Sequence, residues 1–135
     1  MIQSIELLMP KQAENVWPQL EELFSLADSR ELIEEIFSKV KQGLCAIFVY
    51  YQDKQPKLAL AIQFNQIGST KSVEILSVAG TAIKEFKRAY WKYIVNWLKA
   101  NRTKLIEVPN VERFKSIYED ETKIRAVGSH VRISI

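Results

Sequence analysis

Apolar residues dominate three consecutive stretches in the middle of the chain. These stretches, Cys45–Tyr51, Lys57–Gln66 and Ser72–Ala79, are rich in β-branched and aromatic residues, and turn-forming residues separate them. Runs of this composition bounded by turn residues are typical of strands. Because both connections are short, the pattern predicts an antiparallel meander of three strands.

Two helices are predicted before this meander. Apolar residues recur at helical spacing over Trp17–Ala27. In the next helix the apolar face consists of Leu32, Ile33, Ile36, Phe37 and Val40. We expect Asp28 to cap this second helix, with Glu31 completing a capping box, and Gly43 to end it.

The longest predicted helix, Ile83–Ala100, follows the meander. Its apolar stripe comprises Ile83, Phe86, Tyr90, Ile94, Trp97 and Leu98. Thr81 is the expected N-cap. Trp91 falls beside the stripe, where we expect it either to border a partner surface or to complete the core.

The other elements complete a single α/β domain over residues 1–135. They are a first strand at Ser4–Met9 stopped by Pro10, a strand at Leu105–Val108, a short helix at Val111–Tyr118, and a hairpin of Ile124–Val127 with His130–Ile135. The order is β-α-α-β-β-β-α-β-α-β-β, which favours a mixed, mostly antiparallel sheet with helices on both faces. The edges of the meander and the tail Val131–Ile135 are candidates for pairing with another chain's sheet.

Composition narrows the class of protein. The chain has 135 residues and a net charge of +3, and no apolar run approaches the length of a membrane span. Met1–Pro10 lacks the features of a signal peptide, so we expect a soluble domain that acts without a membrane. We expect Cys45, the only cysteine, to be a buried apolar residue. His130, the only histidine, has no cysteine or carboxylate at metal-ligand spacing, so we expect no metal site.

Charge is distributed unevenly along the chain. Residues 1–35 contain eight acidic and two basic side chains, whereas residues 84–104 contain one acidic and seven basic ones. A basic stripe with Trp91 at its edge comprises Arg88, Lys92, Lys99, Arg102 and Lys104. The low net charge and the acidic start argue against a dedicated nucleic-acid binder. We therefore assign Arg88, Trp91, Lys92 and Lys99 as candidate contacts to a protein partner or to a second copy.

The element order and several stretches resemble the GNAT (Gcn5-related N-acetyltransferase) fold, and in particular its short relatives in tailed bacteriophages and prophages. The matching stretches are Val16–Leu23, Ile36–Leu44, Val73–Gly80 and Tyr93–Leu105. The resemblance extends over about the whole chain. It implies the GNAT fold and a place in the virion or the host cytoplasm.

The resemblance also implies where a catalytic site would lie. Enzymes of this family bind acetyl-CoA through a glycine-rich loop before the long helix, and here Gly80, Thr81 and Lys84 occupy that segment. Glu74 stands where the family often places a glutamate base, and Tyr118 resembles the tyrosine that protonates the leaving thiolate. Gly80 is the only glycine of the loop, and the glycine spacing of the family is absent.

Two hypotheses follow, and a weaker third is a nucleic-acid-associated protein that uses the basic helix. In the first, the chain is a non-catalytic phage protein that uses the GNAT fold as a scaffold, binds other virion proteins or itself, and needs no cofactor. In the second, it is a divergent acetyl-CoA-dependent N-acetyltransferase with Glu74 as base and Tyr118 as acid. The missing glycine spacing favours the scaffold.

Overall fold

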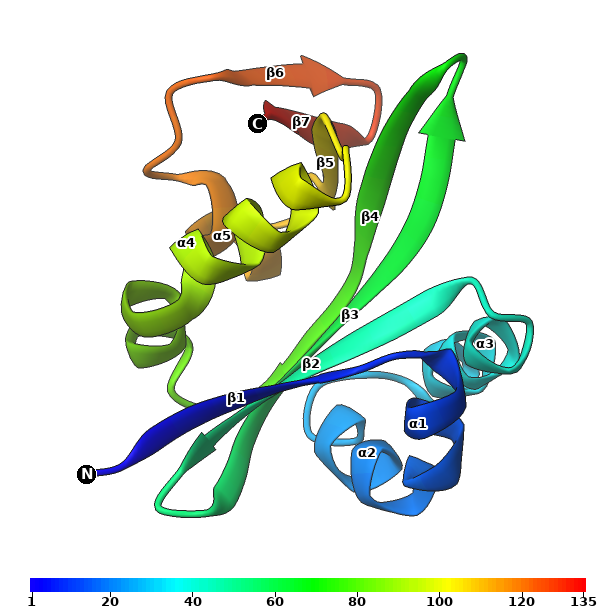
Figure 1. Cartoon of the computed structure of the whole chain (residues 1–135), viewed down its shortest axis with the longest axis vertical. Coiled ribbons are helices and arrows are strands. Elements are labelled where there is room, and N and C mark those ends of the chain that lie inside the picture. The colour runs from blue at the N-terminus through cyan, green and yellow to red at the C-terminus, as the bar shows by residue number, and fades with distance from the viewer.

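The computed structural model describes residues 1–135, and its elements follow the predicted order with one helix more (Figure 1). In chain order the elements are β1 Gln3–Leu8, α1 Pro10–Asn15, α2 Trp17–Phe24, α3 Arg30–Lys41, β2 Cys45–Gln52, β3 Gln55–Ile67, β4 Thr70–Gly80, α4 Ile83–Ala100, β5 Leu105–Pro109, the 3-10 turn η1 Glu112–Phe114, α5 Lys115–Tyr118, β6 Ile124–Val127 and β7 His130–Ser134. The extra helix is α1. Pro10 ends the first strand as expected, but it also begins α1, because proline is well suited to the first position of a helix.

All strands belong to one seven-stranded sheet in the order β1-β2-β3-β4-β5-β7-β6. Only the β4–β5 pair is parallel, so the sheet is mixed and mostly antiparallel, as predicted. The strands of the meander lie inside this sheet, and β7 lies between β5 and β6. Strands β2 and β7 are therefore paired on both sides, so Val131–Ile135 completes the sheet of this domain, and β1 and β6 are the edges.

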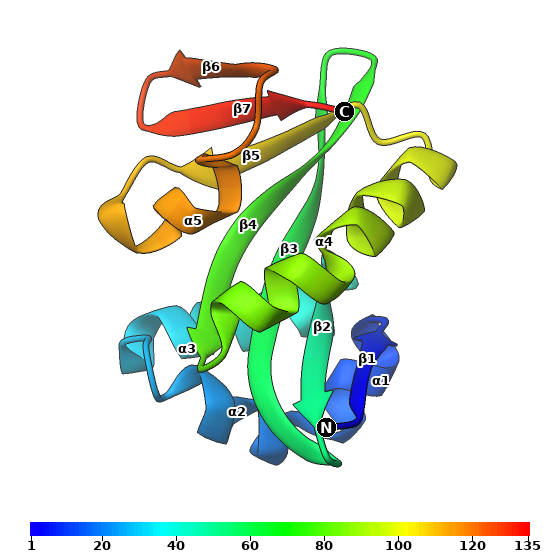
Figure 2. The same ribbon diagram turned by 90° about the vertical axis from the view of Figure 1, so that its left-hand side faces the viewer.

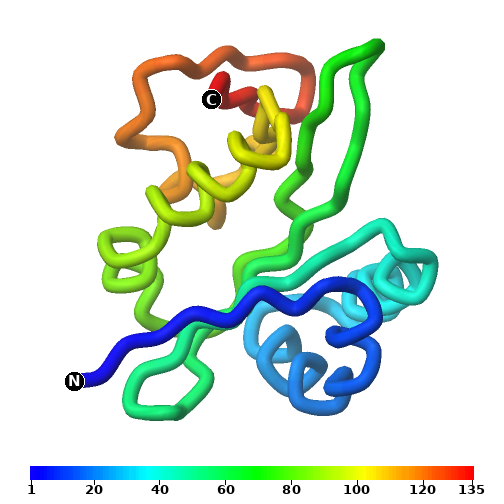
Figure 3. Tube along the Cα trace, viewed as in Figure 1, coloured from blue at the N-terminus to red at the C-terminus, as the bar shows by residue number.

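Helices cover both faces of the sheet (Figures 1 and 2). Helices α1, α2 and α3 pack against one face of the meander, and α4 crosses the other face. The α4 side contains the larger core, which includes Phe48, Tyr50, Phe86, Ile94 and Ile106. The trace in Figure 3 shows β5, α5, β6 and β7 gathered at one end, away from α1 to α3.

Helix α4 begins and ends at the predicted residues, and all residues of its predicted apolar stripe pack in or against the core, joined by Trp91. Its buried residues are Phe86, Trp91, Ile94 and Leu98. Trp91 is only 7% exposed and belongs to the core, so it does not form an exposed partner contact. Tyr90 and Trp97 stay partly exposed. None of the helices combines the length and the apolar character that a membrane crossing requires.

Candidate functional site

The strands β4 and β5 separate in the middle of the sheet. Their parallel pairing covers only Ser72 to Glu74 on β4, opposite Leu105 to Glu107 on β5. Beyond Glu74, β4 continues to Gly80 without a β5 partner. A bulge at this point adds one residue to β4, between the pairs Ile62–Ile75 and Ala61–Ser77. The divergence leaves one side of β4, beyond Glu74, without a neighbouring strand.

Glu74 stands at the start of this divergence and pairs with His130. The Nε2 atom of His130 lies 2.9 Å from Oε1 of Glu74, and both side chains are partly buried, at 30% and 23% exposure. The other ring nitrogen lies 3.3 Å from the Ser129 hydroxyl oxygen. The residue before His130 thus helps to hold the imidazole, and the β6–β7 hairpin brings it to β4. Such a carboxylate–imidazole pair can accept a proton from a bound group.

The sequence analysis predicted a catalytic role for Glu74 and none for His130. Their contact depends on β7 returning beside β5, which a spacing of 56 positions does not reveal. His130 lies opposite Pro109 on β5, and from there its ring reaches past β5 to Glu74. No group of three metal-ligating side chains forms around this pair.

Tyr118 lies at the end of α5, as predicted, and does not contact the Glu74–His130 pair. Its hydroxyl donates a hydrogen bond to Oδ1 of Asn110 at 3.3 Å. Asn110 follows directly on β5, so this bond ties α5 to the end of that strand. The predicted helix Val111–Tyr118 is split into η1 and α5, and Tyr118 packs partly against the core on the α4 side.

The connection from β4 to α4 consists of only Thr81 and Ala82. The expectation that Thr81 caps α4 is wrong, because Ala82 is the N-cap, in a left-handed conformation with φ of 60° and without a side-chain hydrogen bond. The Thr81 backbone N–H donates instead to the Lys57 carbonyl at 2.7 Å. A Cβ on Gly80 would lie 2.1 Å from that same oxygen, so only glycine fits at this close approach of β4 and β3.

A groove of about 510 Å³ runs between the first half of α4 and the α5 region. Its basic lining residues are Lys84, Lys87, Arg88 and Lys92, and its acidic ones are Glu119, Asp120 and Glu121. The Lys87 ammonium group is already bound to the Ser116 carbonyl and to Asp120. The Trp91 indole N–H donates to Glu121 at 3.0 Å. Lys84, Arg88 and Lys92 are exposed and form no ion pair, so they are the cations free to bind an anion here.

Lys99 is not part of this groove. It lies near the end of α4 and lines a separate groove with Arg102 and Lys104. The predicted contact set of Arg88, Trp91, Lys92 and Lys99 is therefore divided between two places on the helix.

An ion pair between the buried carboxylate of Asp28 and the partly exposed side chain of Arg113 crosses the divergence of the two strands. The Arg113 guanidinium has Nη2 3.2 Å from the Val78 carbonyl oxygen and 3.2 Å from the Ser77 hydroxyl oxygen. The same nitrogen lies 2.7 Å from Oδ1 of Asp28, whose side chain is fully buried. The Ser77 hydroxyl donates to the other carboxylate oxygen of Asp28 at 2.5 Å. Arg113 therefore occupies the unpaired side of β4.

The sequence did not reveal this network. Asp28 was expected to cap α3, but Ser29 is the cap and its hydroxyl oxygen accepts from the Leu32 N–H at 3.2 Å. The capping-box assignment of Asp28 and Glu31 is wrong for the same reason. Asp28 and Ser29 are adjacent and both are common N-cap residues, so the sequence alone does not show which of them caps α3. Tertiary packing directs the Asp28 side chain into the interior. Cys45, by contrast, is fully buried as predicted, and burial raises the pKa of its thiol to about 12.

No family model matches the chain, and no curated protein matches it in sequence. Solved structures do match its fold. An aminoglycoside acetyltransferase from an uncultured soil metagenomic sample has a TM-score of 0.65 at 11% identity, covering 94% of this chain and 95% of its own. An N-acetyltransferase from Staphylococcus aureus gives 0.61 at 15% identity, covering 98% and 95%. The PaiA N-acetyltransferase from Thermoplasma acidophilum, in complex with coenzyme A, gives 0.60 at 12% identity and covers 100% of both. The chain therefore has the GNAT-like α/β fold that the sequence resemblance implied.

Proposed function

We propose that this chain is an acetyl-CoA-dependent N-acyltransferase of divergent type. The observation that carries the proposal is the Glu74–His130 pair at the point where β4 and β5 separate. A partly buried carboxylate held by an imidazole is suited to taking a proton from an attacking amine. The sequence analysis predicted Glu74 as the base, and the structure adds His130 as the residue that contacts its carboxylate.

The reaction needs two proton transfers. The amine nitrogen attacks the thioester carbonyl carbon, a C–N bond forms, and the C–S bond breaks. The proton lost by the amine goes to Glu74, directly or through His130. The thiolate that leaves takes a proton, and Tyr118 is the candidate donor because its hydroxyl lies at the end of α5, on a side chain that is not fully buried.

The residues at the start of α4 offer partners for the anionic part of acetyl-CoA. The first amides of this 18-residue helix have no hydrogen-bond partner within it, and no side chain caps them. Lys84 and Arg88 add free positive charge in the adjoining groove. When bound, acetyl-CoA would supply the activated acetyl group. The Thr81 amide, committed to the Lys57 carbonyl, would not contribute.

The structural neighbours support an enzyme more than a scaffold. The three described above are acetyltransferases by name, and one was solved with coenzyme A. At 11–15% identity, the similarity to these structures shows a shared fold.

A second candidate is a non-catalytic GNAT-fold protein that acts through protein contacts. It is favoured by Arg113, which takes up the Val78 carbonyl and the Ser77 hydroxyl on the unpaired side of β4. The two-residue connection Thr81–Ala82 favours it too, because it is too short for a glycine-rich phosphate loop. A role in a phage virion or its assembly would belong to this candidate, and it rests on the sequence resemblance.

One experiment separates the two candidates. The purified protein is titrated calorimetrically with acetyl-CoA, with coenzyme A as control, and release of the free thiol is then followed with a panel of amines. The enzyme proposal predicts saturable binding and thiol release that falls at least tenfold in Glu74→Gln. Glu107→Gln is the matched control, because Glu107 is the neighbouring carboxylate on β5 and pairs with Arg132 instead. Absence of heat and of thermal stabilisation at millimolar ligand would overturn the enzyme proposal in favour of the scaffold.

A further inference from the structure

Four cations from three segments gather at the end of α4. Lys71 comes from the start of β4, Lys99 from the last turn of α4, and Arg102 and Lys104 from the loop that leads to β5. All four are exposed, and none forms an ion pair with a carboxylate. We call them the terminal basic cluster. Because Lys71 and Lys104 lie outside the helix, the favourable effect of cations on a helix C-terminus explains only part of it.

Backbone hydrogen bonds hold these segments together. The Lys104 N–H donates to the Lys71 carbonyl, and the Ile135 N–H donates to the Lys104 carbonyl, each at 3.0 Å. Two adjoining grooves of about 720 and 440 Å³ share Arg102, Lys104 and Ile135. No Asp or Glu side chain lines either groove. A surface of this kind binds phosphate groups.

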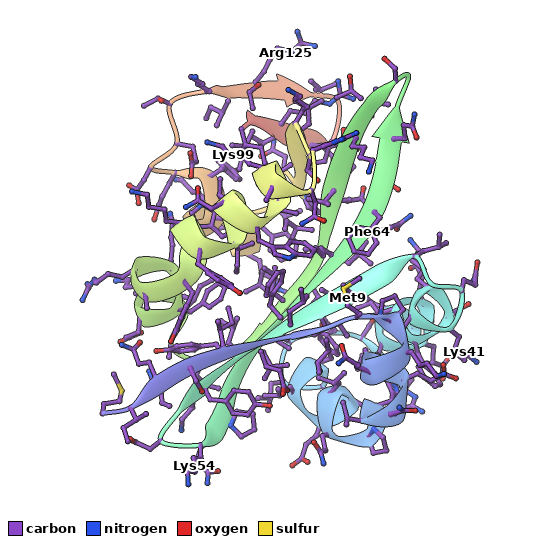
Figure 4. The ribbon with its side chains drawn as sticks, in the orientation of Figure 1. Met9, Lys41, Lys54, Phe64, Lys99 and Arg125 are labelled. Atoms are coloured by element: carbon purple, nitrogen blue, oxygen red, sulfur yellow. The ribbon has the colours of Figure 1, made fainter.

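A further pocket of about 560 Å³ joins the terminal basic cluster at Lys71. It is lined by the partly exposed residues Phe64 and Trp97 and by two residues with amide side chains, Gln66 and Asn101. In Figure 4, Phe64 lies on the β3–β4 hairpin and Lys99 on α4. Aromatic rings beside amide groups are the groups that stack on a nucleobase and hydrogen-bond to its edge.

We infer from these features that the end of α4 is a binding site for a nucleotide unit of a single strand or for a free nucleotide. The base would occupy the pocket of Phe64 and Trp97, and the phosphates would lie on the terminal basic cluster. The sequence analysis identified a basic stripe along the whole of α4. In the structure, only the cations of the terminal basic cluster adjoin an aromatic pocket, and they lie at one end of the helix. The Lys84 groove shares no residue with the two grooves of the terminal basic cluster, and Lys84 lies about 22 Å from Lys99 along a helix that rises about 1.5 Å per residue, so the inference does not rest on the proposed acyl transfer.

The test uses fluorescence anisotropy of the full chain with a labelled octathymidylate, over a range of salt concentrations. Changing Lys71, Arg102 and Lys104 together to Gln should weaken binding at least tenfold at low salt. The slope of log affinity against log salt should also fall by about two, since each lost phosphate contact on a single strand removes about 0.7. The matched control removes three exposed charges elsewhere, through Lys11→Gln, Lys41→Gln and Lys54→Asn (Figure 4 labels Lys41 and Lys54). Equal losses in both variants would overturn the proposal.

Competitors then test the base pocket and the source of the nucleotide. Unlabelled octathymidylate should compete better than inorganic polyphosphate of equal charge. Competition by thymidine monophosphate alone at micromolar concentration would identify a free nucleotide as ligand. Polyphosphate competing as well as the oligonucleotide would refute base recognition.

Discussion

Arg113 and Asp28 meet through the opening between β4 and β5, with Arg113 Nη2 2.7 Å from Asp28 Oδ1. Asp28 comes from the loop on the α1–α3 side of the sheet, and Arg113 comes from η1 on the α4 side. The contact therefore joins the two layers where the sheet itself is interrupted. It is both a candidate source of stability and an obstacle to any ligand that approaches β4 there.

Removing the Asp28 carboxylate should destabilise the fold. In Asp28→Ala the guanidinium of Arg113 and the hydroxyl of Ser77 lose their partner, and we expect a loss of about 2–3 kcal/mol in urea unfolding. The value lies below that for a fully buried pair because Arg113 keeps 35% exposure. Glu34→Ala, which breaks the exposed pair with Arg30, should leave the urea midpoint unchanged. A midpoint equally unaffected in Asp28→Ala would show that the buried pair does not stabilise the fold.

Gly80→Ala should be far more harmful than Gly68→Ala. Both glycines have positive φ, 127° and 62°, but only a Cβ at Gly80 meets another strand, at the Lys57 carbonyl. We expect a cost of about 2–4 kcal/mol for Gly80→Ala and about 1 kcal/mol for Gly68→Ala. Thermal unfolding of the two variants side by side measures the difference. Equal melting temperatures would contradict the close approach of β4 and β3.

The Cys45 thiol should make stability fall at high pH. Burial raises its pKa to about 12 in the folded chain, whereas an unfolded cysteine ionises near about 8.5. The neutral thiol therefore stabilises the fold below about pH 8.5, and this contribution is lost as pH rises toward 12, by ~1.4 kcal/mol per unit.

Urea unfolding between pH 8 and 10.5 checks this, with Cys45→Ala as the comparison. The free energy of unfolding of the wild-type chain should decline more steeply than that of the variant. Parallel declines would show that Cys45 ionises as easily in the folded chain as in the unfolded one. Thiol reagents should likewise react with the native protein only as fast as it unfolds.

Tyr118→Phe tests the acid of the proposed reaction. Losing the proton donor should lower kcat for thiol release by about 100-fold and leave KM for acetyl-CoA nearly unchanged. Tyr93→Phe is the control, because Tyr93 lies on the exposed side of α4. A lower melting temperature with unchanged kcat would assign Tyr118 a structural role through Asn110 alone.

The regular elements were predictable because each depends on neighbours in the chain. The ends of Ile83–Ala100 coincide with those of α4, and the hairpin around Gly128 forms as expected. Gly43, with φ of 77°, ends α3 as the pattern required. Errors arose where two local signals competed, as between Asp28 and Ser29 at the start of α3, or where a residue beside an apolar stripe was buried with it, as at Trp91 in α4.

The candidate site was only half predictable. Glu74 and Tyr118 could be assigned from the family resemblance, residue by residue along the chain. His130 and Arg113 could not, because their relevance depends on contacts with Glu74 and Asp28 that span 56 and 85 positions. Nor does a local pattern show that Lys71 lies beside Lys104, since the order of β4 and β5 in the sheet brings them together.

The amino-acid sequence by itself determined the class of fold, the order of the elements and the polarity of the charge, because periodicity, turn residues and composition act over a few residues. Tertiary structure alone decided which side chains meet across the divergence of β4 and β5 and at the end of α4. Those contacts follow from the order of strands in the sheet and from which polar groups are buried. Both are set by the packing of the whole chain, where a buried carboxylate such as Asp28 must find a partner from a distant segment.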